Sequence, residues 1–98
     1  MTVKLNLIVN DTMIHTDYFV QGFIDHVASG IIEALEGTGK ITDLDLSIDG
    51  EQTVLNLNGN RIALNAFTAG IIKNTIIGMV SSLKEVNNIK NVHIFLHK

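Results

Sequence analysis

The chain has no cysteine, no proline and no tryptophan, and its aromatic residues are four phenylalanines and one tyrosine. The lack of cysteine excludes disulfide bonds, thiolate metal ligands and a cysteine nucleophile. Without proline, no residue marks a rigid linker or a kinked helix. Because aromatic residues make up only 5% of a chain that is 46% apolar, we expect a core of aliphatic side chains.

Positive charge and long apolar runs are also scarce. Seven lysines and arginines are scattered along a chain with ten acidic residues and a formal net charge of −3, so no basic cluster predicts a nucleic acid partner. No run of about 18 uncharged apolar residues predicts a membrane-spanning helix. The first residues have the pattern of a strand rather than a signal peptide. We therefore expect a single cytoplasmic domain over residues 1–98.

The segment 44–64 predicts three consecutive strands. Its apolar and polar residues alternate, which is typical of half-buried strands. Two pairs within it, Asp49-Gly50 and Asn58-Gly59, favour two-residue hairpin turns. Cross-strand partners share one face of a sheet. Seven apolar residues should then lie on the same face: Leu44, Leu46, Ile48, Leu55, Leu57, Ile62 and Leu64.

The two turns also predict how the strands are paired. The first turn would place Ile48 opposite Glu51, and the second would place Leu57 opposite Asn60. Both turns give the same apolar face, which supports a three-stranded meander.

An amphipathic helix is predicted on each side of this segment. The first begins near Thr16, has Asp17 in its first turn and stops at Gly37. The second is capped by Asn65 and ends near Val86. Their predicted core stripes are Val20, Phe23, Ile24, Val27, Ala28, Ile31 and Leu35, and Ala69, Ile72, Ile76, Met79, Val80 and Leu83.

Alternating patterns at 3–9 and 92–97 add a first and a last strand. The order is therefore strand, helix, three strands, helix, strand. We predict an α+β two-layer sandwich, in which a five-stranded mixed sheet has both helices on one face and its last strand is parallel to its first. A ferredoxin-like plait with one added strand is one arrangement that this order allows. The order of the strands within the sheet is left open.

Two partial motifs do not predict a cofactor or a metal. Gly37–Lys40 ends like a phosphate-binding loop, but it follows a helix and lacks a hydroxyl residue after the lysine. Asp45–Gly50 matches the first half of a calcium loop, but Asn56 stands where the bidentate glutamate belongs. His93 and His97 lie about 13 Å apart along a strand, too far for one ion. We expect no metal site and no cofactor.

The second helix has more apolar residues than one buried stripe requires. Phe67 and Ile71 lie away from the stripe, with Ile77 at its border, and Gly70 and Gly78 would let another backbone approach closely. These residues are the predicted interface of a homodimer in which the helix meets its own copy. The function that follows is a non-catalytic, self-associating interaction module. Three competing interpretations are self-association through the open sheet face, a different protein partner, and packing of Phe67 and Ile71 within the monomer.

A second hypothesis is a small enzyme or an anion-binding protein. His15 and Asp17 precede or begin the first helix, and Asn65 begins the second. Backbone amides at helix N-termini attract anions. A pocket that gathers these three residues would favour this hypothesis over the interaction module.

Overall fold

The computed structural model describes residues 4–36, 40–50, 52–83, 86 and 88–97. Within these residues it has six strands and two helices, which confirms the α+β class but not the predicted count of five strands. The elements are β1 (Lys4–Val9), β2 (Thr12–Ile14), α1 (Tyr18–Glu36), β3 (Asp43–Asp49), β4 (Gln52–Leu57), β5 (Asn60–Ile62), α2 (Ala66–Val80) and β6 (Asn91–His97).

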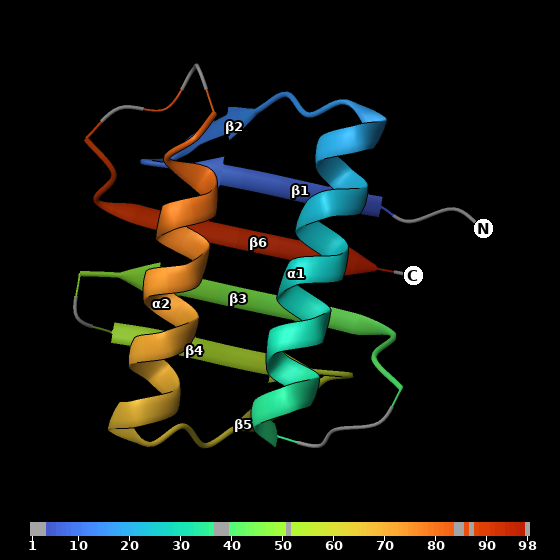
Figure 1. Cartoon of the computed structure of the whole chain (residues 1–98), viewed down its shortest axis with the longest axis vertical. Helices are drawn as coiled ribbons and strands as arrows, with labels where there is room; N and C mark the ends of the chain where they lie inside the picture. Colours follow the sequence, from blue (N-terminus) through green and yellow to red (C-terminus); the bar gives the residue numbers. More distant parts are fainter. Residues whose placement is uncertain (1–3, 37–39, 51, 84–85, 87, 98) are drawn as a thin grey trace.

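The sheet has the order β2-β1-β6-β3-β4-β5, and every neighbouring pair is antiparallel. The predicted mixed sheet is therefore wrong, since β6 runs opposite to β1, and the ferredoxin-like arrangement is not confirmed. Figure 1 shows the reason: both helices lie across the strands rather than along them. The 19 residues of α1 span about 28 Å, and six strands are roughly 24 Å wide. Each helix thus carries the chain across the sheet and does not fix the direction of the next strand.

The strand missing from the prediction is β2. Asn10 and Asp11 both have positive φ angles, of 51° and 66°, and Val9 pairs with Thr12, which describes a two-residue hairpin turn. Asparagine and aspartate tolerate this conformation better than other residues with side chains. The three residues that follow the turn, Thr12–Ile14, were not predicted to pair with the first strand.

The second predicted hairpin is confirmed and the first is displaced by one residue. Asn58 and Gly59 have φ angles of 51° and 83°, and Leu57 pairs with Asn60 as predicted. In the first hairpin Asp49 pairs with Gln52, so the predicted pairing of Ile48 with Glu51 is wrong, and Glu51 itself lies outside the described residues. When a turn moves by one residue along the chain, each residue of one strand pairs with a residue two positions away from the predicted partner. The side chains therefore stay on the predicted face.

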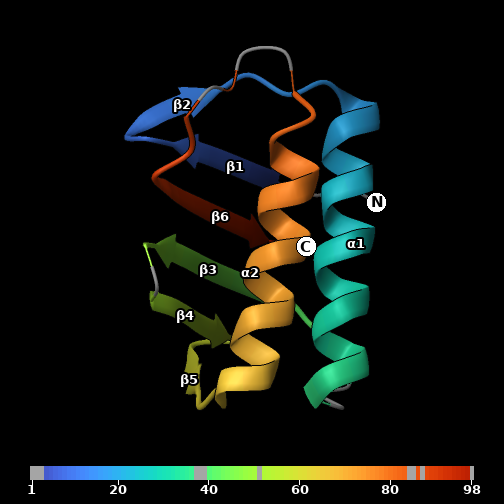
Figure 2. The same ribbon diagram turned by 60° about the vertical axis from the view of Figure 1, so that its left-hand side comes forward.

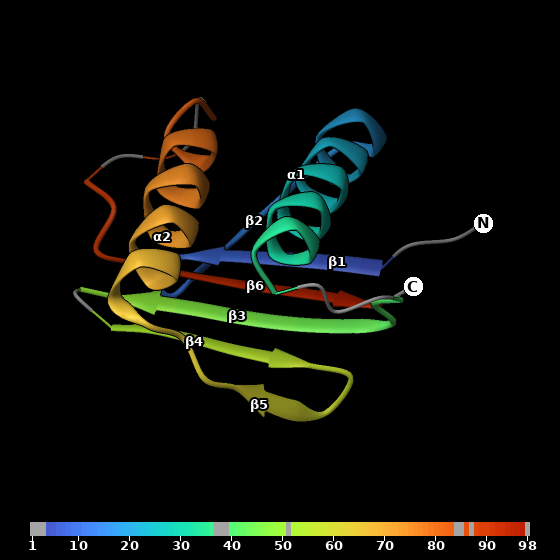
Figure 3. The same ribbon diagram turned by 60° about the horizontal axis from the view of Figure 1, so that its bottom comes forward.

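Both helices cover one face of the sheet, and the opposite face carries no helix among the described residues (Figures 2 and 3). The core between the two layers is aliphatic, as predicted. It includes the predicted apolar face of the meander, where Leu44, Leu46 and Leu55 are fully buried. On α1 the buried apolar residues recur every four positions, at Ile24, Ala28 and Ile32.

The helix ends differ from the predictions in two places. Asp17, rather than Thr16, caps α1, because its Oδ1 accepts a hydrogen bond from the N–H of Val20 at 2.8 Å. Asn65 caps α2 as predicted. That helix ends at Val80, before the predicted Val86. The predicted stop of the first helix, Gly37, lies outside the described residues.

Candidate functional site

All five aromatic residues of the chain lie outside the core. Their exposed fractions are 92% for Tyr18, 79% for Phe19, 51% for Phe23, 69% for Phe67 and 39% for Phe95. Aliphatic side chains fill the space between the layers, so packing does not account for the aromatic residues. Four of the five lie on the two helices, and only Phe95 belongs to the sheet.

On α1, Phe19 and Phe23 stack with their ring centroids 6.4 Å apart and their planes inclined by 9°. The prediction that Phe23 belongs to the core stripe is wrong. Ile24 takes the core position, and Phe23, one residue earlier, lies at the outer border of the stripe. Phe19 was not among the predicted site residues. Three of five aromatic residues within one short segment, from Tyr18 to Phe23, were the available signal.

The predicted interface residues of α2 do not all remain accessible. Phe67 and Gly78 are exposed, and a side chain added at Gly78 would meet no neighbouring atom within 4 Å. Gly70 and Ile71 are half-buried. Ile77 packs against the core and offers less surface to a partner.

The two helices together form one outer surface, which we call the helix face. It comprises Phe19, Phe23, Gly30, Phe67, Gly70, Ile71 and Gly78. The helices are antiparallel, so the first turn of α1 lies at the same end of the layer as the last turn of α2 (Figure 1). Phe19 and Phe23 are therefore at the end that carries Gly78. Phe67 is at the opposite end, toward which Gly30 lies.

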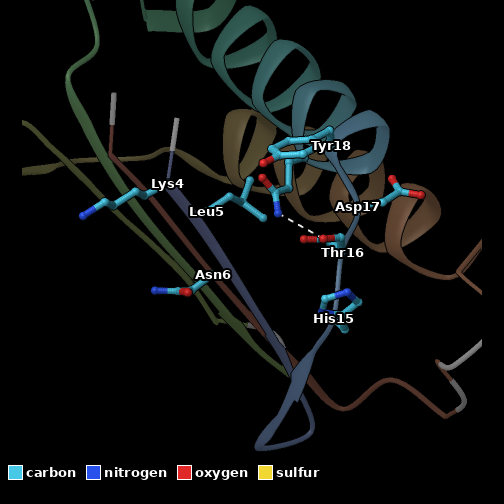
Figure 4. A pocket seen from close by; sticks show the side chains of 8 residues that line it. Lys4, Leu5, Asn6, His15, Thr16, Asp17 and Tyr18 are labelled. Carbon is cyan, nitrogen blue, oxygen red and sulfur yellow. Dashed lines mark hydrogen bonds between the residues drawn. The ribbon is translucent and has the colours of Figure 1, made fainter. Parts of the chain in front are cut away.

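A recess of about 710 Å³ lies between β1 and the start of α1, and it contains two of the three residues predicted to bind an anion. His15 and Asp17 line it, as Figure 4 shows. Asn65 is not among the lining residues and begins α2 at the other end of the layer. The structure therefore does not gather the predicted set.

The helix N-termini are also occupied by their own capping side chains. Asp17 Oδ1 accepts the Val20 N–H, and Asn65 Oδ1 accepts the Thr68 N–H, each at 2.8 Å. The carboxylate of Asp17 places negative charge where an anion would bind. Both features weaken the case for an anion site.

The uncovered side of the sheet, which we call the sheet face, is organised by two histidine–aspartate pairs. His93 Nε2 lies 2.6 Å from Asp45 Oδ1, and His97 Nδ1 contacts Asp43 Oδ1. Each pair joins β6 to β3, and Phe95 stands between the two imidazoles along β6. All four paired side chains are 41–51% exposed, so these are surface contacts.

The sheet face shows no complete catalytic or metal-binding arrangement in the part of the chain that the structure describes. A shallow hollow of about 390 Å³ is lined by Asp43, Asp45, Asn56, Gly59, Phe95 and His97. Within the described residues, no three histidine or carboxylate side chains are placed to hold a metal ion. No described hydroxyl is hydrogen-bonded to either imidazole, as a nucleophile activated by a base would be.

Comparison with known proteins adds no family. No family model matches the chain, and neither a curated protein nor a solved structure is similar enough to be matched with it. No helix in the described segments has the length and apolar character needed to span a membrane.

Proposed function

We propose that this chain is a non-catalytic interaction domain of the cytoplasm, which pairs with a second copy of itself through the helix face. The observation that carries the proposal is the position of the aromatic residues: three phenylalanines on one face are each more than half exposed. Large apolar side chains exposed on one face beyond what the core needs are typical of an interaction site. The absence of cysteine agrees with a cytoplasmic location, since small secreted domains commonly depend on disulfide bonds.

A second copy fits this face because its two ends are complementary. One end of the layer presents the Phe19–Phe23 stack on α1, and α2 presents Gly78 there. In a two-fold pair whose axis runs along the helices, α1 of one copy lies over α2 of the other. Each phenylalanine stack then meets a glycine of the partner, and Phe67 meets the end of α1 that carries Gly30. Large side chains opposite glycines allow close packing of helices.

The size of the face agrees with such a pair. The molecule measures 34 × 32 × 19 Å, so a broad face offers roughly 1,000 Å², compared with the ~800 Å² per partner of a typical specific interface. Six phenylalanines, three from each copy, would contribute roughly 9–18 kcal/mol at full burial, as an upper bound. Association costs an estimated 4–15 kcal/mol. A dissociation constant in the micromolar range is the expected result.

Sedimentation velocity with a matched pair of variants tests the proposal. Phe67→Ser removes an aromatic side chain from the helix face, whereas Phe95→Ser makes the same change on the sheet face. We expect Phe67→Ser to weaken the dimer at least about tenfold, which corresponds to ~1.4 kcal/mol, and Phe95→Ser to leave it unchanged. The opposite pattern would place the interface on the sheet. If the unmodified chain is instead a monomer and Phe67→Ser lowers its melting temperature, Phe67 belongs to the monomer's own packing.

A further inference from the structure

One edge of β1 is only half covered. On its inner side, β6 pairs with all of Lys4–Val9, whereas β2 pairs only with Leu7, Ile8 and Val9. In an antiparallel ladder, alternate residues direct both backbone groups toward the same neighbour. Val9 flanks the two-residue turn and therefore forms a hydrogen-bonded pair with Thr12 of β2, and Leu7, two residues earlier, forms the next such pair with Ile14. Leu5 therefore directs its N–H and C=O to that same side, where no described strand lies beside it.

The segment after β2 leaves the sheet before it reaches Leu5. Because Leu7 pairs with Ile14, a longer β2 would bring Thr16 opposite Leu5. Instead, the carbonyl oxygen of Thr16 accepts a hydrogen bond from Gln21 Nε2 at 3.0 Å, and the chain enters α1. Leu5 and Thr16 then line the recess together, with β1 on one side and the start of α1 on the other (Figure 4).

We propose that this recess binds an extended peptide segment of a partner protein, which adds a strand to the sheet beside Leu5. Among the described residues, no partner pairs with the backbone donor and acceptor that Leu5 directs to this edge, and an extended chain offers both groups at the matching spacing. Only a narrow occupant fits, because the His15–Gln21 segment bounds the recess opposite β1. The peptide runs antiparallel to β1, in line with β2.

The side chains around the recess determine which peptide fits. Leu5 points toward the first turn of α1, whereas Lys4 and Asn6 point to the other side of the strand (Figure 4). The peptide residue opposite Leu5 shares its face and meets the exposed ring of Tyr18, so it is apolar. Its neighbours point to the sheet face, and the one opposite Lys4 is acidic. The recognised pattern is an apolar residue between polar residues of which at least one is acidic.

This site is separate from the helix face and does not depend on the proposed dimer. The test uses the full chain and the short peptide acetyl-Val-Glu-amide, whose valine lies opposite Leu5 and whose glutamate lies opposite Lys4, so that it does not reach Leu7, which already pairs with Ile14. Hydrogen exchange followed by NMR reports on the backbone directly. In the free protein we expect the Leu5 amide to exchange at least ~100-fold faster than that of Leu7, and saturating peptide to slow it at least ~10-fold.

Two controls identify the contact. A peptide with an N-methyl group on the valine keeps every side chain but loses the donor to the Leu5 carbonyl, and it should not protect Leu5. Lys4→Glu should weaken binding of the glutamate peptide, and a peptide with lysine in place of the glutamate should restore it.

The proposal is overturned if the Leu5 amide is already protected in the free protein, or if the N-methylated peptide binds equally well. Protection that grows with protein concentration in the absence of peptide would also overturn it, because it would assign the edge to a second copy.

Discussion

The helix face and the sheet face are both open to solvent, but their side chains differ in what they contact. On the sheet face the polar groups are paired with one another: His93 with Asp45, and His97 with Asp43. On the helix face Phe19, Phe23 and Phe67 expose more than half of their surface. Water solvates the polar groups of the sheet face well. Covering the phenylalanines of the helix face, in contrast, lowers the free energy, because it removes apolar surface from water. This difference in exposed apolar surface is why the helix face, rather than the sheet face, is the proposed interface.

The largest effect on stability is expected when substitutions on the two sides of β4 are compared. Leu55 is fully buried beneath the helices, and Val54 points to the sheet face. Leu55→Asp should cost about 4 kcal/mol or more and unfold the domain, because it buries an unpaired carboxylate. Val54→Asp should cost less than about 1 kcal/mol. Urea denaturation measures both values, and equal losses would mean that the sheet face is also covered.

A second change should stabilise the fold and weaken the dimer. Gly78 lies in an exposed part of α2 with open space around it. In a dilute sample Gly78→Leu should raise the free energy of unfolding by roughly 0.5–1 kcal/mol, since glycine is a poor helix former. It should also weaken self-association about tenfold or more, a loss of ~1.4 kcal/mol, by filling the place of the partner's phenylalanines.

Thermal unfolding at low concentration and sedimentation at high concentration separate these two effects. Gly22→Leu is a matched control, because this glycine is also helical and also has open space, but it is not part of the helix face. A tighter dimer for Gly78→Leu would contradict the proposed packing.

The smallest effect is expected at the histidine–aspartate pairs. Asp45→Asn removes the charge of a carboxylate that is 41% exposed and contacts His93. Exposed ion pairs contribute about 0–1 kcal/mol, so the free energy of unfolding should fall by less than about 1 kcal/mol. The sedimentation coefficient should not change. Dissociation caused by this variant would move the interface to the sheet face.

Local patterns in the sequence were sufficient for the α+β class and for the buried face of the meander. Alternation in segment 44–64 predicted the buried face of the meander, and Asn58-Gly59 predicted its second turn. The face stayed correct although the turn near Gly50 was displaced, because side chains alternate with a period of two. A prediction of which side chains face the core therefore remains correct when the turn is misplaced by one residue.

Two features depended on tertiary structure and were missed. The direction of β6 is not fixed by α2, because this helix crosses the sheet rather than running along a strand, and no local pattern encodes it. Phe23 was assigned to the core because a helical wheel does not show how wide the buried stripe is. The position of Phe67 was predicted from the same wheel, and the structure leaves it exposed.

The most direct test of the proposed pairing is a mixture of two variants that each fail to dimerise. Phe19→Ser with Phe23→Ser removes the large side chains from α1, and Gly78→Leu fills the space on α2. Alone, each variant loses both symmetric contacts. In the mixed pair one contact has the natural phenylalanines on glycine, and the other has leucine facing the serines.

Sedimentation velocity at ~20 μM, well above a micromolar dissociation constant, should show a much larger dimer fraction for the equimolar mixture than for either variant alone. A mixture that stays monomeric, while the unmodified chain dimerises, would contradict the packing of α1 on α2 of the partner.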